Sequence, residues 1–152
     1  MKPRRRLPSG TIIRRLLSSQ KLGVLATREA RTPYQSLVAF AASADLKHIY
    51  FATESKTRKH TNLLKSPEVS MLFDNRGMAE DDFNKGIAVT ALGKAEAVKS
   101  RSLKKARQLY LEKHPSLAGF LKSPTCRMFQ IRVKTYFLVT EFQRVAEYKP
   151  VG

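Results

Sequence analysis

Six stretches of the chain have the apolar and β-branched composition of short strands, and residues that favour turns separate them. The connections between the first three are short, which predicts antiparallel neighbours, because parallel strands need long crossovers. Six strands in one small domain favour a closed barrel, since closure removes exposed sheet edges. The predicted strands are Leu22–Thr27, Tyr34–Ala42, His48–Thr53, Val69–Phe73, Ile87–Val98 and Met128–Thr140.

Three further segments have apolar residues at helical spacing. Ser9 or Thr11 is expected to cap the first of them, and Ser100 or Ser102 the third. Ser66-Pro67 ends the second, because proline disfavours helix in the preceding residue. The predicted helices are Thr11–Leu17, Thr57–Lys65 and Ser100–Glu112, with a shorter apolar piece at Leu117–Leu121. The predicted class is α+β, dominated by antiparallel sheet: a six-stranded split β-barrel with short flanking helices.

A glycine, an acidic stretch and a basic start are the irregular features of this pattern. Gly93 lies inside the fifth predicted strand, where a bulge or a close approach of another backbone is the usual explanation. Residues 78–86 are polar and acidic and are expected to form a surface loop. Pro8-Ser9-Gly10 separates a basic tail, residues 1–10, from one folded domain, residues 11–152.

Lysine and arginine outnumber the acidic residues and give a formal net charge of +17. Such a field attracts nucleic acid, anionic membrane or phosphorylated small molecules. A solvated basic surface is the alternative, because the charges are spread along the whole chain. Without a long apolar run or a recognisable export signal, and with Cys126 as the single cysteine, the expected location is the bacterial cytoplasm and no membrane is expected as a partner.

The segment Thr53-Glu54-Ser55-Lys56-Thr57-Arg58-Lys59 places hydroxyl side chains and cations where a predicted strand leads into a predicted helix. Backbone N–H groups at a helix start, together with the positive end of the helix dipole, bind anions. The hydroxyl groups can add donors, Arg58 can donate two parallel hydrogen bonds, and the two lysines add point charges. The local charge of +2 suits a phosphate monoester, which carries ~1.5 to 2 negative charges at neutral pH.

An ordinary capped helix with a basic, exposed first turn is the alternative interpretation of this segment. The helix dipole disfavours cations in a first turn, so Lys56, Arg58 and Lys59 lie where acidic residues would be preferred. A bound anion would relieve that conflict. On physical grounds alone both interpretations stay open.

Several stretches together resemble the FMN-binding split-barrel family related to pyridoxamine 5′-phosphate oxidase. The resemblance spans about residues 11–145 and includes the strand and helix start around the phosphate segment. The stretches that carry it are Leu22–Thr27, Tyr34–Phe40, Ile49–Thr53, Ser55–Lys59, Asn62–Ser70, Gly93–Glu96 and Tyr136–Val139.

The resemblance implies a split barrel that forms a homodimer with FMN at its interface. In that family the second strand runs along the flavin ring, the end of the third strand and the following helix start hold the phosphate, and a residue of the fifth strand faces the ring. The residues thereby implied to contact FMN are Ser36, Leu37, Val38, Ala52, Thr53, Ser55, Lys56, Thr57, Arg58, Lys59 and Ala88, with no catalytic residue assigned.

A flavin would carry the redox chemistry itself, so the expected activity is an oxidoreductase that passes hydride or electrons to an unidentified small acceptor. Vitamin B6 oxidases have a C-terminal substrate clamp with Trp and Arg, whereas this chain has no Trp and ends at Tyr148–Gly152, so oxidation of pyridoxine phosphate is not expected. Because some relatives bind haem or a deazaflavin, the identity of the cofactor stays open. An FMN- or haem-binding protein without turnover is a further alternative.

A nucleic-acid-binding module is the rival from another class, because the net charge is high. Such a module needs exposed aromatic residues among its cations, as Tyr34, Tyr50 and Tyr136 could provide. Most aromatic residues instead follow the apolar alternation, so nucleic acid is not expected as a partner. The three histidines are scattered and match no metal-site spacing.

Overall fold

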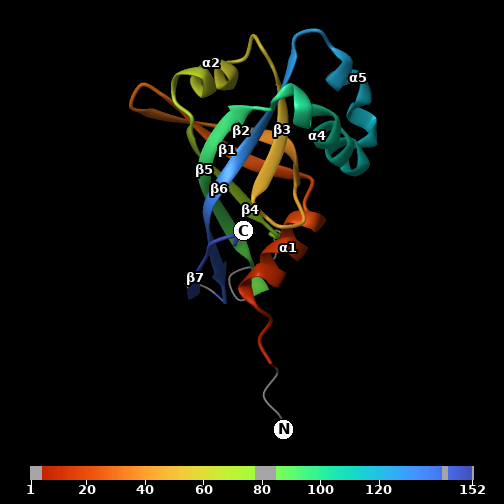
Figure 1. Ribbon diagram of the computed structural model, residues 1–152. Helices are drawn as coiled ribbons and strands as arrows, with labels where there is room; N and C mark the ends of the chain where they lie inside the picture. Colours follow the sequence, from red (N-terminus) through yellow and green to blue (C-terminus); the bar gives the residue numbers. More distant parts are fainter. Residues whose placement is uncertain (1–4, 78–84, 142–143, 152) are drawn as a thin grey trace.

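The computed structural model describes residues 5–77, 85–141 and 144–151, and its centre is an antiparallel barrel (Figure 1). Six strands follow one another in the order β3-β2-β1-β4-β5-β6, pairing of β3 with β6 closes the barrel, and β7 extends the sheet beyond β6. The strands are β1 Leu22–Glu29, β2 Thr32–Ala42, β3 His48–Glu54, β4 Glu68–Asp74, β5 Ala88–Ala97, β6 Cys126–Thr140 and β7 Arg144–Tyr148. The predicted α+β class and six-stranded barrel are confirmed.

β6 is the strand that closes the barrel. It pairs with β5 along one edge and with β3 along the other, from His48 opposite Arg132 to Glu54 opposite Cys126. Along β6 the buried Ile131 and Val133 alternate with exposed basic residues, as expected for a strand with one face in the core. The Phe51 and Phe129 rings stack 5.7 Å apart across the closing pair.

Short helices flank the barrel at both ends (Figure 1). They are α1 Ser9–Ser19, α2 Arg58–Lys65, α4 Ser100–Lys113 and α5 Ala118–Lys122, with a 3-10 turn at Pro115–Leu117. Neither α1 nor α4 has a side-chain cap, so the predicted caps Ser9, Thr11, Ser100 and Ser102 are wrong. Packing of the amphipathic faces stabilises these helices and does not require a cap at their starts.

Two apolar clusters hold the fold together. The larger fills the barrel, and the smaller lies beneath α4, where Tyr110 and Ala106 pack against Ala52 of β3. The end of α4 is tied to the rest of the fold, because His114 Nε2 lies 2.7 Å from the carbonyl oxygen of Phe40 and Lys113 Nζ donates to the carbonyl of Leu17 at 2.7 Å. The end of α4 is therefore attached to α1 and β2.

Gly93 marks an irregularity between β5 and β6, as the sequence predicts. The register shifts between Leu92 and Gly93, so that Lys134 of β6 has no partner in the pairing. A Cβ atom at Gly93 would lie 2.2 Å from the carbonyl oxygen of Arg132. Both expected explanations, a bulge and a close backbone approach, are confirmed.

The seventh strand was not predicted. Its sequence Arg144-Val145-Ala146-Glu147-Tyr148 is short and contains two charged residues, and it pairs with the end of β6. The ring of Tyr148 lies against Gly10 of α1 and 6.3 Å from the ring of Tyr136. The predicted acidic loop falls largely on residues 78–84, which lie outside the described residues.

Two buried tyrosines should make folding sensitive to alkaline pH. Burial raises the pKa of Tyr110 from 10.0 to about 12, and burial also raises the pKa of Tyr136, whose hydroxyl donates to the carbonyl of Leu46 at 2.6 Å. Because the folded chain keeps protons that the unfolded chain releases, this contribution to stability is complete below pH 10.0 and is lost as the pH rises through the folded values.

Replacing Tyr136 by phenylalanine should therefore lower the free energy of unfolding at moderate pH and make its decline at alkaline pH less steep. At pH ~8 the free energy of unfolding should fall by about 1 to 2 kcal/mol, because the Leu46 carbonyl loses its donor. Above pH ~10 it should decline less steeply than in the parent chain. Urea unfolding at the two pH values, with the half-buried Tyr34→Phe as control, measures both; an equally steep alkaline decline in the Tyr136 variant would contradict the assignment.

Candidate functional site

The start of α2 is built around a pair of threonine hydroxyls. Thr57 is the N-cap residue: its Oγ1 accepts from the backbone N–H of His60 at 3.3 Å and donates to the carbonyl of Glu54 at 2.9 Å. Thr53 is 1% exposed, and its Oγ1 lies 2.8 Å from that of Thr57. These two predicted phosphate donors are therefore engaged in the cap.

The backbone amides before and within the first turn divide into used and free groups. Ser55 N donates to the carbonyl of Thr125 at 2.9 Å, and Thr57 N donates to that of Glu54 at 3.2 Å. Arg58 and Lys59 are the first two helical residues, and within the described part of the chain their amides have no acceptor. These two N–H groups are thus available to an anion.

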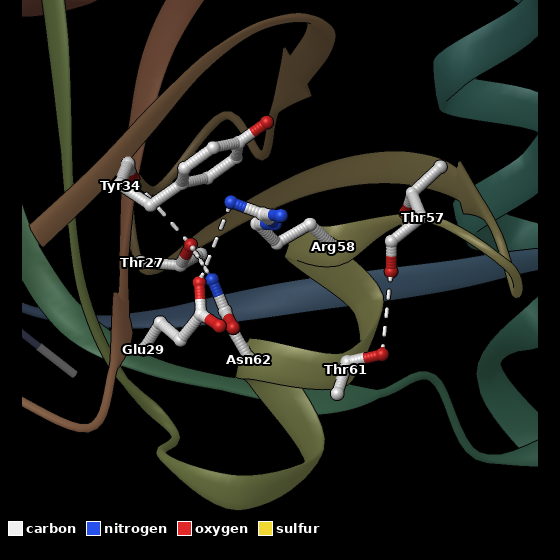
Figure 2. A network of polar contacts seen from close by, with 7 residues as sticks. All are labelled: Thr27, Glu29, Tyr34, Thr57, Arg58, Thr61 and Asn62. Atoms are coloured by element: carbon white, nitrogen blue, oxygen red, sulfur yellow. Dashed lines mark hydrogen bonds and ion pairs between the residues drawn. The ribbon is translucent and has the colours of Figure 1, made fainter. Parts of the chain in front are cut away.

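Arg58 points toward the β1–β2 hairpin (Figure 2). Its Nη1 lies 3.6 Å from Glu29 Oε2, and its guanidinium carbon lies 5.6 Å from the centre of the Tyr34 ring. Both Arg58 and Glu29 are largely exposed, so this ion pair contributes little to stability. Sequence reasoning missed Glu29 and Tyr34, because nothing in the local sequence indicates that the hairpin folds over this helix.

A buried amide fixes α2 to the barrel. Asn62 is 2% exposed, and its Nδ2 donates to Thr27 Oγ1 of β1 at 3.1 Å (Figure 2). The hydroxyl of Thr27 in turn donates to the carbonyl of Tyr34 at 3.4 Å. These two hydrogen bonds link α2 to β1 and β1 to β2, and they therefore position the first turn of α2 relative to the hairpin.

An open pocket of about 770 Å³ lies between α2 and the β1–β2 turn. Lys56, Arg58 and Lys65 contribute three cations to its lining, against the single carboxylate of Glu29. Thr57 also reaches it, whereas Thr53, Ser55 and Lys59 do not line it. Only part of the predicted phosphate segment therefore faces one common space.

Lys59 is the other notable cation of this segment. Its ammonium group is partly buried, and burial lowers its pKa below the ordinary value of 10.5. None of the ion pairs formed by the described residues includes it. A partly desolvated cation without a counter-charge is costly, and an anion bound at the helix start would compensate it.

The predicted ring-contact residues of β2 alternate between the two faces of the sheet. Val38 is 5% exposed in the barrel interior, whereas the side chain of Leu37 is 68% exposed on the outer surface. Ser36 Oγ is buried and has no hydrogen-bond partner in the described structure. Such an orphaned hydroxyl is uncommon in a folded protein and is compatible with a ligand that supplies its partner.

Neither Ala52 nor Ala88 lines the pocket at the start of α2. Ala52 belongs to the apolar cluster beneath α4 and is 7% exposed. Ala88 pairs with Asp74 at the end of β4, whereas α2 leads into Glu68 at its beginning. The two ends of β4 are roughly 20 Å apart at about 3.3 Å per residue. Within one chain, the predicted contacts therefore lie at different places on the barrel.

Neither metal ligands nor a membrane span are found in the described part of the chain. In residues 5–77, 85–141 and 144–151, no three His, Cys, Asp or Glu side chains gather in a way that could hold a metal ion. No described helix is long and apolar enough to cross a membrane.

The closed six-stranded barrel, the extra strand and the short flanking helices define a split-barrel protein of the α+β class. A family model described as pyridoxamine 5′-phosphate oxidase matches residues 12–140. The chain therefore belongs to the pyridoxamine 5′-phosphate oxidase family, as the resemblance predicted. No curated protein sequence matches the chain significantly.

Solved structures share the fold at low sequence identity. A haem-binding protein from Mycobacterium smegmatis has a TM-score of 0.83 and 20% identity over 96% of this chain, which spans 60% of that protein. General Stress Protein 26 from Bacillus anthracis str. Sterne has a TM-score of 0.70 and 19% identity, covering 92% of this chain and 97% of that one. An FAD-binding protein from Mesorhizobium loti has a TM-score of 0.68 and 20% identity, covering 87% and 94%.

Proposed function

We propose that the protein binds FMN, with the phosphate at the start of α2, and acts as a flavin-dependent oxidoreductase on a small substrate. The observation that carries this proposal is Lys59, whose ammonium group is partly buried and forms no ion pair among the described residues, at a helix start where the amides of Arg58 and Lys59 have no described acceptor. A phosphate accepting from these amides would supply the missing negative charge.

Arg58 supports the phosphate placement because its present partner is weak. The exposed pair with Glu29 can be exchanged for a phosphate at little cost. A guanidinium can then donate two hydrogen bonds to phosphate oxygens. The hydroxyls of Thr53 and Thr57 would support phosphate binding indirectly, because their hydrogen bonds stabilise the start of α2.

Two residues of β2 support placing the ring along this strand. Leu37 offers an exposed apolar side chain on the outer face, and the adjacent Ser36, on the opposite face, has a buried hydroxyl that lacks a partner among the described residues. The FMN group, when bound, would supply electron transfer, and the residues of this chain would bind it and orient it. Family membership supports a flavin, whereas a solved relative described as haem-binding makes haem the second candidate.

We also propose that the protein is a homodimer. An apolar row crosses the outer face of the sheet, because Val24 of β1 pairs with Leu37 of β2 on one side and with Leu72 of β4 on the other. Leu72 is 37% exposed, as is the nearby Leu92 of β5. A second copy would cover this row, and it would also let Ala88 of one copy approach a ligand held by α2 of the other.

The dimer is tested by changing Leu37 and Leu72 together to lysine. Paired charges should abolish an apolar interface, so light scattering should report a monomer where the parent chain is a dimer. Val145→Lys on β7, at a residue that is 61% exposed, is the matched control and should remain dimeric. A parent chain that is monomeric at micromolar concentration would refute the dimer.

The cofactor is tested by adding FMN, riboflavin or haem to protein freed of ligand. FMN should bind with a shifted absorbance spectrum, and roughly hundredfold more tightly than riboflavin, because riboflavin lacks the phosphate and at least two charge-assisted hydrogen bonds of about 1.5 kcal/mol each. Equal binding of FMN and riboflavin would show that the phosphate does not contribute to binding and would refute the proposed phosphate site. Uptake of haem without uptake of FMN would show that the cofactor is haem and not FMN.

A further inference from the structure

The α4 and α5 helices lie together on one side of the barrel (Figure 1), and they carry a second group of cations. On α4, Arg101, Lys104, Lys105 and Arg107 are exposed, and the ion pairs among the described residues include none of them. The apolar side of the same helix is covered by the barrel, through Ala106 and Tyr110. The charge on this side therefore faces solvent uncompensated.

Three cations from three different elements converge on one hollow there. Arg107 of α4, Lys122 of α5 and Arg127 of β6 all line a cavity of about 530 Å³, and its lining contains no carboxylate. Arg127 is held in place because its Nη1 donates to the carbonyls of Pro124 at 2.8 Å and Cys126 at 3.1 Å. No described residue accepts a hydrogen bond from its Nη2 or Nε.

The thiol of Cys126 shows that the positive charges reach the hollow, since Cys126 also lines it. Burial raises the pKa of this thiol and Glu54 adds to the effect, whereas Arg107 and Arg127 act in the opposite direction. Both guanidinium groups are thus close enough to act on a group that lines the hollow, where they oppose the larger effects of burial and Glu54.

Apart from the Ser123 hydroxyl and the Cys126 thiol, the rest of the lining is apolar. Leu111, Ala118, Leu121 and Pro124 form a surface that offers no hydrogen bonds from side chains. A phosphate alone would use the cations and leave this surface exposed to water. The volume falls within the range of about 300 to 1,000 Å³ that is usual for small-molecule sites.

We propose that the hollow between α4, α5 and the start of β6 is a nucleotide site, where Arg107, Lys122 and Arg127 bind the phosphate and the apolar lining contacts the base. The hollow adjoins the phosphate segment, because Arg127 pairs with Thr53 and Cys126 with Glu54, but it shares no lining residue with the pocket at the start of α2. The proposal therefore does not depend on the FMN site. The same chemistry is offered by a free mononucleotide and by one unit of a single-stranded nucleic acid, so the two sources are distinguished by experiment.

Cys126 is a built-in reporter, because it is the only cysteine of the chain and lines the hollow. Its alkylation by a maleimide is measured alone, with adenosine 5′-monophosphate, with adenosine, and with a short single-stranded oligodeoxyadenylate. The monophosphate should slow alkylation and adenosine should not, because only the former engages the cations. Protection by the oligonucleotide alone would show that the site binds single-stranded nucleic acid and not a free mononucleotide. Protection by none of these would overturn the proposal.

The double variant Arg107→Ala/Lys122→Ala removes two exposed cations that take part in no described hydrogen bond. The ligand concentration needed for protection should rise at least roughly tenfold, as expected for losing charge-assisted contacts. Arg15→Ala/Lys21→Ala removes the same charge from exposed residues elsewhere and should leave protection unchanged. An equal loss in both variants would show that net charge alone attracts the ligand and would overturn the proposal.

The FMN proposal has a separate readout in the same variants. Retention of FMN should be unaffected by Arg107→Ala/Lys122→Ala, whereas changes at Arg58 and Lys59 should leave protection of Cys126 intact. If instead the hollow variant lost FMN, the flavin would belong in the hollow. In that case the proposed FMN placement would fail and the nucleotide site would stand.

Discussion

Gly93→Ala is expected to lower the free energy of unfolding by about 2 to 3 kcal/mol, the upper part of the range for overpacking a core. The new Cβ would lie 2.2 Å from the Arg132 carbonyl oxygen and 2.9 Å from a methyl carbon of Ile131. A side-chain atom could move aside, but the carbonyl belongs to the backbone of β6, so β5 and β6 must separate locally. Urea unfolding of the variant measures the loss.

Gly119→Ala is the matched control for this change. Gly119 lies in α5, and a Cβ atom there would meet no atom within 4 Å. Alanine favours helix over glycine by about 1 kcal/mol, so this variant should be as stable as the parent chain or slightly more so. A Gly93 variant with parent stability would show that the bulge at Leu92 and Gly93 can relax without cost.

The second large effect is expected on cofactor affinity. Arg58→Ala/Lys59→Ala should weaken FMN binding roughly hundredfold, because both charge-assisted contacts to the phosphate are removed. Fluorescence titration with FMN measures the change. Lys94→Ala/Lys134→Ala, which removes two exposed cations of the sheet, should bind FMN as the parent chain does.

The stability of the same variant separates a binding role from a structural one. The Arg58–Glu29 pair is exposed and contributes little, and burial already disfavours the Lys59 cation, so ligand-free stability should stay the same or rise slightly. A variant that binds FMN normally would place the phosphate elsewhere. A variant that is strongly destabilised would show that the two residues serve the fold.

The local sequence pattern was sufficient to predict most of the helices and strands. The predicted limits of the fourth strand and of α2 differ from the structure by a residue or so, because alternation and the Ser66-Pro67 stop are local signals. The helix caps of α1 and α4 were wrong, since those helices begin where their apolar faces meet the barrel. β7 was missed, because five residues with two charged side chains give only a weak strand signal, and the pairing with the end of β6 is seen only in the fold.

The candidate site was only partly predictable. The sequence located the cations of the phosphate segment and the helix start that presents them. It could not show that the Thr53 and Thr57 hydroxyls satisfy one another, that Arg58 turns to Glu29, or that Lys59 is partly buried. Each of these depends on how close two segments come after folding, and for Glu29 and Arg58 that proximity is created by the β1–β2 hairpin.

The sequence by itself determined the antiparallel strands, the break at Gly93, the basic start of α2 and, through resemblance, the family. These follow from spacing and composition over a few residues, where short-range geometry dictates the outcome. The tertiary structure alone decided the β3–β6 closure, the orphaned Ser36 hydroxyl, and the meeting of Arg107, Lys122 and Arg127 around one hollow. Those features join residues distant in sequence, and only the packed fold brings their atoms within range of one another.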